Sequence, residues 1–566
     1  ASYRKAISLK PNLAEGYNNL GVVLRKCGKL EESVANCQRA LKVKPDYVDA
    51  HNSLGVALQV LGKLEEAVAS FHNAIGLQPD CADAWNNLKL STKALQFSKE
   101  QKGQKGNLYE KGLSEQARAS TDFAMLEYYL DKFKPHESEG KIRKVMAALP
   151  PKTTEQVIIN DQSNKLETSC QFPCKLVALL CFGRSGTGLL HSLIDGHPEI
   201  STLPSIYLRD FFDAGIWSKI SADGWRRIPE RFADEFAVLF DASSPQSTPG
   251  RIGEDSSFLG RKEGTTNVGE NRDESLSLDR DQFCSEALRL MSHYQKVDPK
   301  LFFFVIHAAF EKVLGTKTKK HTVFYHLHNP DDFGKLNFLR YVPDARLIMM
   351  VREPVQCCES WIRTPFRDNE YDKITPRIVS MLFAIDQAAF QIQDSVGVRL
   401  EDLKMKPEAT LGSLCTWLGI KESPSLYQMT TQGKKWWGDP TSPDYDDKEA
   451  MSPFGKVAIK RPVGTIFSEN DQFVFRTLFY PFSVRFGYQE PDPIGFEKDL
   501  KAIRPLFDEL LDFEKVMSEK LEIDVAQFKR SGSYLLLRAG FMDRWDVLNE
   551  FKDYPHLLSP LEITTK

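Results

Sequence analysis

The chain opens with a sequence that repeats every 34 residues. Prolines recur at this interval at Pro11, Pro45 and Pro79, and leucines and small residues between them keep the same step. Within each unit the apolar residues fall at helical spacing, and a glycine stands where the chain must turn. A repeat of this length is typical of helix pairs that stack into a solenoid, because each pair buries its apolar face against its neighbours. We therefore expect an α-solenoid over residues 1–90.

This segment resembles a tetratricopeptide-repeat array with two whole units flanked by partial ones. Such arrays bind peptides or other subunits, so the resemblance implies a peptide or protein partner on the repeats. Asparagines recur in register at Asn18, Asn52 and Asn86. Their amides either hydrogen-bond an extended peptide or cap backbone groups between repeats. The polar, lysine-rich sequence that follows predicts a helical connector over residues 91–171.

Composition excludes several classes of protein. With 566 residues, of which 42% are hydrophobic and 27% charged, the chain is long enough for several globular domains. Its net charge of −3 gives no overall positive field, so we expect no nucleic-acid partner. The longest apolar stretch, residues 301–310, is far shorter than the ~20 residues of a membrane span. The ten cysteines form neither a dense disulfide framework nor a paired metal motif, so we expect free thiols and no metal.

The first site motif is a buried strand, KLVALLCF, that runs directly into the loop GRSGTG and an apolar helix. Backbone N–H groups of such a loop and the N-terminus of the helix attract an anion, and Arg184, Ser185 and Thr187 add donors and charge. A Walker A loop would require a lysine where Gly188 stands. We therefore expect a phosphate-like ligand here but not a nucleoside triphosphatase. The alternative is a tight strand-to-helix turn with no ligand.

A second motif lies further along the chain, where the strand RLIMMV ends at Arg352 and Ser360 follows on an expected helix. Ligands of open α/β sheets bind beyond the carboxyl ends of the strands. Arg352 and the glycine loop are therefore expected to face one crevice. The alternatives are a surface ion pair between Arg352 and Glu353 and a simple helix-face hydroxyl at Ser360.

These motifs resemble the 3′-phosphoadenylyl sulfate-dependent sulfotransferases, and most closely the tyrosylprotein sulfotransferase branch. GRSGTGLLHSLIDGHPEI is similar to the 5′-phosphosulfate loop and its helix, and VPDARLIMMVREP is similar to the 3′-phosphate segment. The likeness covers residues 172–490. It implies a P-loop-like, three-layer α/β sulfotransferase domain with a mainly parallel sheet, which follows the α-solenoid along the chain. Residues 491–566 form a C-terminal extension of unknown role.

The resemblance also implies the ligand and the residues that bind it. The sulfonate donor would be 3′-phosphoadenylyl sulfate (PAPS), and the product 3′-phosphoadenosine 5′-phosphate (PAP). The glycine loop would hold the 5′-phosphate and sulfonate, Arg352 and its helix the 3′-phosphate, and the loop KRPVG a further phosphate oxygen. By position these residues are Arg184, Ser185, Gly186, Thr187, Gly188, Arg352, Ser360, Lys460 and Arg461.

The catalytic side chains are less well defined. In the tyrosylprotein branch a carboxylate that acts as the base follows the first helix, but Pro204 and Ser205 stand at that place here. Asp210 is the nearest substitute, and Asp213, Glu254 and Asp255 are others. His328 occupies the place of a lysine of that branch and is our first candidate, either as the base or as a donor to the leaving group. The alternative for His328 is a structural histidine.

Two further segments could contribute to the site. Residues 260–285 are highly charged, and the safer interpretation is a solvated insertion rather than an acceptor-binding lid. Trp436 and Trp437 could stack on adenine or on an acceptor ring, but packing within the protein is the preferred interpretation.

We therefore expect an enzyme that moves a sulfonate from PAPS to a hydroxyl, that of a peptide tyrosine included, or to an amine. The acceptor would be a protein, a glycan or a small molecule, and the repeats would recruit either the acceptor or a partner. The alternative is a non-catalytic tetratricopeptide scaffold with a relic nucleotide-binding domain. A phosphotransferase is disfavoured because the P-loop lysine is absent. We expect a cytoplasmic location, or a Golgi-type lumen if a natural N-terminal segment precedes residue 1.

Overall fold

The computed structural model describes most of the chain. The described residues are 2–78, 81–101, 157–159, 173, 175–208, 211–244, 259–328, 332–384, 394–440, 442, 445–446, 448–455, 463–550 and 558–564. Within these ranges, no helix has both the length and the apolar character needed to cross a bilayer.

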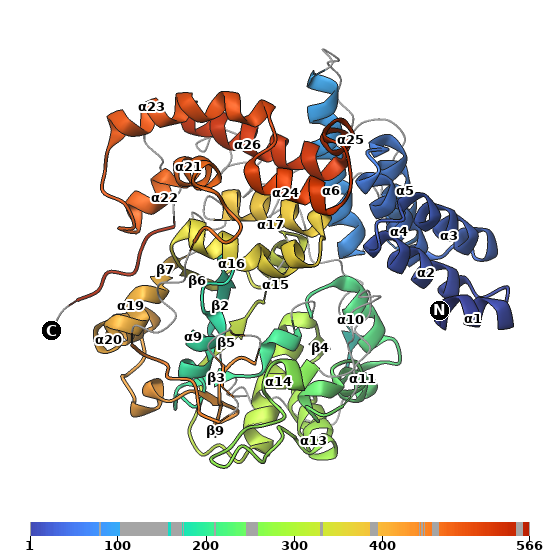
Figure 1. Ribbon diagram of the computed structural model, residues 1–566. Coiled ribbons are helices and arrows are strands. Elements are labelled where there is room, and N and C mark those ends of the chain that lie inside the picture. The colour runs from blue at the N-terminus through green and yellow to red at the C-terminus, as the bar shows by residue number, and fades with distance from the viewer. Residues whose placement is uncertain are drawn as a thin grey trace.

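The N-terminal region is a stack of paired helices (Figure 1). The pairs pack closely because glycines stand at the crossing points: a Cβ on Gly21 would lie 2.7 Å from Cys37 Sγ, and one on Gly55 would lie 2.5 Å from the Phe71 ring. The helices are α1 (Ser2–Leu9), α2 (Ala14–Lys26), α3 (Leu30–Val43), α4 (Val48–Val60), α5 (Leu64–Leu77) and α6 (Ala82–Gln101). The expected α-solenoid is confirmed.

The asparagines of the repeats take part in contacts within the array. Asn87 Nδ2 donates to Asn52 Oδ1 at 3.0 Å and joins α6 to α4. Asn18 is fully buried. These two observations fit the interpretation in which the amides serve contacts between repeats.

The second region is built on a five-stranded sheet in which every neighbouring pair of strands is parallel. The strand order is β3-β5-β2-β6-β7, with β2 at the centre. The strands are β2 (Lys175–Cys181), β3 (Ile200–Thr202), β5 (Thr322–His326), β6 (Arg346–Val351) and β7 (Ser395–Arg399). Buried, apolar central strands of this kind require helices on both faces of a parallel sheet. This confirms the expected mainly parallel sheet.

The two faces of β2 belong to different hydrophobic cores. Val177 and Leu179 pack with α9 (Thr187–Ile194), α19 (Leu400–Met405) and α20 (Pro407–Leu418). Leu176 and Ala178 belong to the larger core on the other face. That core is covered by α14 (Pro299–Val313), α16 (Pro354–Arg367) and α17 (Tyr371–Ala384). The domain therefore has the expected three layers.

Shorter elements surround this framework. On the β3 side lie η2 (Ser205–Leu208), α10 (Ala214–Ser221), η3 (Trp225–Arg227), α11 (Ile228–Glu235), η4 (Ala237–Leu239), α12 (Leu259–Lys262) and α13 (Arg280–Met291). The strands β1 (Val157–Ile158) and β4 (Lys296–Val297) pair antiparallel. The remaining elements before the extension are α15 (Asp332–Tyr341), η6 (Pro424–Tyr427), β8 (Thr430–Thr431), β9 (Lys434–Lys435), α21 (Glu469–Leu478) and α22 (Tyr480–Arg485).

The C-terminal extension joins the repeats to the α/β domain. Figure 1 shows its helices above the sheet and beside the repeats. Lys93 Nζ of α6 lies 2.8 Å from Asp543 Oδ2, and a Cβ on Gly62 would lie 2.3 Å from the Arg530 carbonyl oxygen. The helices are α23 (Pro493–Ile503), η7 (Arg504–Asp508), α24 (Asp512–Lys520), α25 (Val525–Arg530) and α26 (Gly532–Glu550).

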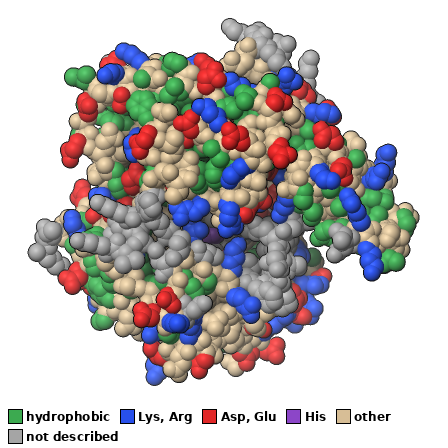
Figure 2. Space-filling view, viewed as in Figure 1, with side chains coloured by type: hydrophobic (Ala, Val, Ile, Leu, Met, Phe, Trp, Pro, Cys, Tyr) green, Lys and Arg blue, Asp and Glu red, His purple; other side chains and the backbone are tan. Residues whose placement is uncertain are grey.

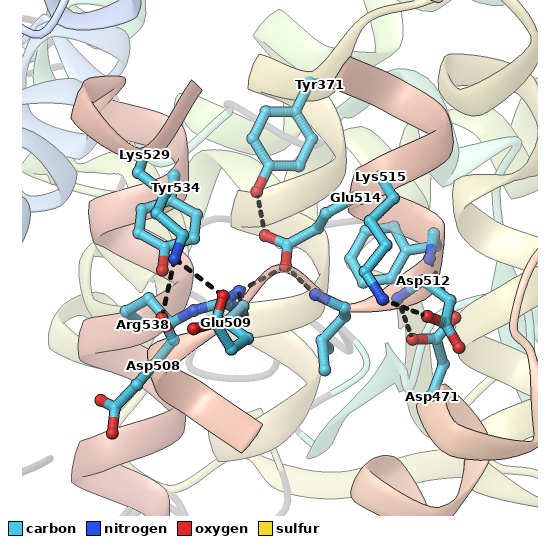
Figure 3. A network of polar contacts seen from close by, with 12 residues as sticks. Tyr371, Asp471, Asp508, Glu509, Asp512, Glu514, Lys515, Lys529, Tyr534 and Arg538 are labelled. Carbon is cyan, nitrogen blue, oxygen red and sulfur yellow. Dashed lines mark hydrogen bonds and ion pairs between the residues drawn. The ribbon is translucent and has the colours of Figure 1, made fainter. Parts of the chain in front are cut away.

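A buried polar network fixes the extension to α17 (Figure 3). Glu514 is fully buried and pairs with the buried guanidinium of Arg538. Tyr371 Oη of α17 donates to Glu514 Oε1 at 2.5 Å, and the backbone N–H of Leu511 donates to Glu514 Oε2 at 2.9 Å. The Arg538 guanidinium also lies 4.3 Å from the centre of the Tyr534 ring. Burial of the Tyr371 hydroxyl and the adjacent carboxylate raise the pKa of Tyr371, so this tyrosine remains a hydrogen-bond donor.

The last described segment runs along the outer strand of the sheet. Gly397 N–H donates to the Ser559 carbonyl oxygen at 2.8 Å, and Leu561 N–H donates to the Gly397 carbonyl oxygen at 2.8 Å. Pro560 forms a parallel bridge with Gly397. Residues 558–561 therefore lie against β7 in the manner of a further strand.

Candidate functional site

The glycine loop lies between β2 and α9, as the sequence predicts. Gly183 and Gly186 have φ angles of +57° and +89°. A Cβ on Gly186 would also lie 2.7 Å from Leu400 Cδ1. Only glycine combines this backbone conformation with this close approach. The turn brings the first residues of α9 directly to the carboxyl end of β2.

The polar residues of the loop surround the N-terminus of α9. Ser185 is buried and its Oγ accepts from the Phe182 N–H at 3.2 Å. Thr187 is the first residue of α9 and is also buried. The Arg184 side chain is 38% exposed. A helix N-terminus with these donors and one cation fits a phosphate or sulfonate group.

Arg352 lies at the same edge of the sheet as the glycine loop. β6 is the parallel neighbour of β2, with Met350 in register with Cys181. Cys357 of α16 lies between the two motifs, because its Sγ donates to the Phe182 carbonyl oxygen at 2.8 Å. Burial raises the pKa of the Cys357 thiol, and the nearby charge of Arg352 opposes that shift. Arg352 is itself 2% exposed, which argues against the surface ion pair considered above.

Ser360 lies on α16 and is largely buried. Its neighbour Glu359 accepts hydrogen bonds from the N–H groups of Gly464, Thr465 and Phe467 at 2.9, 3.1 and 3.1 Å. These bonds tie the last residue of the KRPVG motif and the residues after it to the helix that carries Ser360. Lys460 and Arg461 themselves lie outside the described residues.

Three imidazoles gather at the end of β5, the strand on the other side of β2. The ring centres of His326 and His328 are 5.2 Å apart, and His191 of α9 lies 5.5 Å from His326. Burial lowers the pKa of His191 and His326, and the charge of His328 adds to the effect on His326. His326 is therefore neutral at physiological pH. His328 is half-buried, whereas His326 is buried.

Of the carboxylates proposed from the sequence, only Asp213 lies within the described residues. Asp210, Glu254 and Asp255 lie outside the described residues. Asp213 Oδ1 accepts from Asn337 Nδ2 of α15 at 3.1 Å. Asp213 therefore has a structural partner in the fold.

A short hairpin is anchored to the C-terminal end of α9. β8 and β9 are joined by a two-residue turn, Gln432 and Gly433, with φ angles of +49° and +71°. Asp195 accepts from Thr430 Oγ1 at 2.7 Å and from the N–H of Gly433 at 2.8 Å. This carboxylate positions the hairpin, and hence Trp436 after it, beside the glycine loop.

The charged insertion packs against this hairpin, which corrects the expectation of a solvated segment. Trp436 Nε1 donates to the Glu263 carbonyl oxygen at 3.1 Å, and Trp437 Nε1 donates to the Gly269 carbonyl oxygen at 2.8 Å. Lys434 Nζ also lies 2.8 Å from Glu274 Oε2. Residues 259–276 therefore form a folded wall, and the two tryptophans hold it in place.

Glu263 of this wall is a potential functional residue that the sequence did not reveal. Arg184 Nη2 lies 3.5 Å from Asp439 Oδ2. Burial raises the pKa of Glu263 to about 7, the charge of Asp439 adds to the shift, and Lys262 and Arg184 oppose it. In the sequence Glu263 is one acidic residue in a charged run, so no local signal separates it from its neighbours.

Figure 2 shows Lys and Arg side chains gathered along the middle of the visible face, between its upper and lower halves. Among the described residues, no group of three or more His, Cys, Asp or Glu side chains is arranged to hold a metal ion.

Comparison with known families agrees with these motifs. A model of the sulfotransferase family matches residues 177–424, a range that contains the glycine loop, the histidine cluster, Arg352 and Ser360. Models of the TPR repeat and the tetratricopeptide repeat match residues 2–35, 23–62 and 48–81. A search of curated proteins gave no significant match. The chain thus unites N-terminal tetratricopeptide repeats with a domain that belongs to the sulfotransferase family.

Proposed function

We propose that the chain transfers a sulfonate from PAPS to a hydroxyl or amine acceptor and releases PAP. The observation that carries this proposal is the position of two elements suited to bind anions at one edge of the sheet. The glycine loop follows β2, and the buried Arg352 follows its parallel neighbour β6. A ligand with phosphates at both ends of a nucleoside suits such a pair of elements.

In this proposal the loop residues bind the 5′-phosphate and the sulfonate. Arg184 supplies charge, Ser185 and Thr187 supply hydroxyls, and Gly186 and Gly188 leave the backbone N–H groups accessible. Arg352 and Ser360 bind the 3′-phosphate, with Lys460 and Arg461 as further contacts.

The reaction requires an in-line approach of the acceptor to sulfur while the bond to the 5′-phosphate oxygen breaks. His328, which follows β5 beside the loop strand, is proposed to stabilise the leaving oxygen or to take the acceptor's proton. Asp210 stays a second proposed catalytic residue. Positioned donors around the sulfonate supply the remaining stabilisation.

The repeats are proposed to recruit the acceptor or a partner protein. The acceptor classes are protein, glycan and small molecule, with peptide tyrosine included because of the tyrosylprotein likeness. The ion pair between Lys93 of α6 and Asp543 of α26 joins the array to the C-terminal extension. A cytoplasmic location is part of the proposal and is tested by imaging the tagged chain.

Calorimetric titration with PAP tests the proposed nucleotide site. We expect wild type to bind with micromolar affinity, about −8 kcal/mol, and not to bind ATP with comparable affinity. Arg184→Ala and Arg352→Ala should each weaken binding by tenfold or more. Arg346→Ala is the matched control for Arg352→Ala. Arg346 is the first residue of β6, at the end of the strand opposite to Arg352, and it pairs with Asp394.

The possible outcomes separate the two functions considered. Binding that both site variants lose supports the nucleotide site, and transfer of labelled sulfonate from PAPS then supports the enzyme. Binding without transfer to any acceptor supports the non-catalytic scaffold. No binding of PAP by wild type contradicts the proposal.

A further inference from the structure

We propose that Glu263 is the carboxylate that accepts the acceptor's proton during sulfonate transfer. The inference rests on the proposed function and adds a catalytic residue to it. Three relationships place Glu263 at the site: one to the glycine loop, one to α9 and one to the segment beyond β3.

The first relationship runs through Asp439. This carboxylate lies 3.5 Å from the guanidinium of Arg184 and also acts electrostatically on Glu263. Arg184 itself acts on Glu263 with the opposite sign. Glu263 therefore lies within electrostatic range of the cation that would face the sulfonate.

The second relationship runs through Trp436. Its indole N–H donates to the Glu263 carbonyl oxygen at 3.1 Å. The far edge of the same ring lies 3.8 Å from the position of a Cβ on Gly188. One indole ring thus separates the backbone of Glu263 from the first turn of α9.

The third relationship places Glu263 near residues 204–205, where the resemblance to the tyrosylprotein branch implies a carboxylate. Tyr207 belongs to η2, which begins at residue 205. Tyr207 Oη lies 3.2 Å from Thr265 Oγ1, two residues from Glu263. Burial raises the pKa of Tyr207, and the Glu263 charge adds to this shift. The wall therefore brings a carboxylate beside the segment that lacks one.

The surroundings of Glu263 suit a base at neutral pH. Burial raises its pKa to about 7, and Asp439 contributes in the same direction. Lys262 on the same segment and Arg184 on the loop oppose the shift, and Tyr207 faces it from η2. A base whose pKa lies near the working pH combines a large ionised fraction with useful basicity.

The proposed step balances without any further reactant. The acceptor oxygen or nitrogen forms a bond to sulfur while the bond between sulfur and the 5′-phosphate oxygen of PAPS breaks, and PAP leaves with that electron pair. The proton of the acceptor passes to the Glu263 carboxylate. The resulting carboxylic acid then releases the proton to solvent.

Proton uptake during PAP binding tests the position of Glu263 without an acceptor. An anion bound nearby raises the pKa of the carboxylate, so wild type should take up protons when it binds PAP at pH 7. Titrations in buffers of different ionisation enthalpy measure this uptake. We expect less uptake in Glu263→Gln, with PAP bound at least as tightly. Glu270→Gln is the matched control, because Glu270 lies in the same wall, exposed and paired with Lys435.

The release of PAP from PAPS tests the catalytic role, with unsubstituted phenol as acceptor because it keeps its proton near pH 7, or with water where phenol is not turned over. The wild-type rate should rise with pH to a plateau above about 7. Glu263→Gln should be slower by about 100-fold or more and should lack this rise. Asp439→Asn should move the rise to lower pH, because it removes a like charge from Glu263.

Equal proton uptake and an unchanged pH profile in Glu263→Gln would overturn the inference and leave the nucleotide site intact. Failure of wild type to bind PAP would instead overturn the proposed function. The two failures are therefore distinguishable in the same set of titrations.

Discussion

Leu400 packs directly against Gly186, so that the first residue of α19 closes one side of the glycine loop. A Cβ on Gly186 would lie 2.7 Å from Leu400 Cδ1, and Gly186 has a φ of +89°. The shape of the loop thus depends on a residue from the far edge of the sheet. The contact couples the end of β7 to the proposed 5′-phosphosulfate site.

Gly186→Ala adds only one methyl group, but it should change the conformation of the glycine loop. The alanine must adopt a left-handed backbone conformation, which costs about 1–3 kcal/mol. Its methyl group must also displace the Leu400 side chain. We expect PAP affinity to fall by at least about tenfold, or about 1.4 kcal/mol. Calorimetry with PAP measures the effect.

Gly188→Ala is the comparison within the same loop, because Gly188 also belongs to the proposed nucleotide site but has space for a methyl group. Gly188 lies in α9, and the nearest atom to an added Cβ would be Trp436 Cη2 at 3.8 Å. The variant should keep or slightly raise stability, by up to about 1 kcal/mol, because alanine favours the helix. A comparable loss of PAP binding in both variants would show that space around Gly186 is not the cause.

Breaking the buried pair of Glu514 and Arg538 should strongly destabilise the C-terminal extension. Glu514→Gln leaves a buried guanidinium without its charged partner, a change that costs about 3–5 kcal/mol in comparable cases. Urea-induced unfolding measures the loss. Lys515→Ala is the comparison, because its pair with Asp512 at 2.8 Å is solvent-exposed and worth at most about 1 kcal/mol.

Gly62 and Gly28 allow the docking of the repeats to be tested. They occupy equivalent positions in successive repeats and have φ angles of +76° and +73°. A Cβ on Gly62 would lie 2.3 Å from the Arg530 carbonyl oxygen, whereas one on Gly28 would meet no atom within 4 Å. Both alanine variants carry the same backbone strain, but only Gly62→Ala should disturb the contact with α25. We expect it to be about 1–3 kcal/mol less stable than Gly28→Ala.

Faster proteolysis between the repeats and the α/β domain should accompany this loss. Small-angle scattering should also report a larger radius of gyration for Gly62→Ala than for Gly28→Ala. Identical behaviour of the two variants would mean that the array does not depend on this contact.

Asp512 should make stability depend on acidic pH. Hydrogen bonds from Lys515 and Ser468 lower its pKa from 3.8 to about 2. A carboxyl whose pKa is lower in the folded state stabilises the fold above pH 3.8, and this contribution is lost as the pH falls toward 2. Asp512→Asn should flatten the change in unfolding free energy between pH 4 and pH 2. Asp508→Asn, which alters an exposed residue 3.5 Å from Arg504, should leave the slope unchanged.

The sequence predicted those parts of the fold that rest on local patterns. Each repeat unit packs on the next in the same way, so prolines and glycines recur every 34 residues along the sequence. This period predicts the α-solenoid directly. The strand, loop and helix around Gly186 are also contiguous, and the resemblance identified them from one short stretch. Arg352 was placed at the same edge because parallel strands end together.

The parts that the sequence did not predict depend on contacts between distant segments. The wall at residues 259–276 is fixed by Trp436 and Trp437, more than 150 positions away, and neither partner carries a periodic signal. The role of the extension was hidden because α26 contacts α4, α6 and α17 and has no single apolar stripe. Arg538 of α26 is buried. The sequence does not predict this burial, because arginine is a charged residue that is usually exposed.

The segment at residues 558–564 protects the outer strand of the sheet from other chains. An uncovered strand edge offers a row of N–H and C=O groups that can pair with another chain. Here the Gly397 N–H and carbonyl oxygen are already bonded to Ser559 and Leu561, and Pro560 has no N–H to offer outward. Displacement of this segment would uncover the edge of β7 and offer it as a template for edge-to-edge association with another chain.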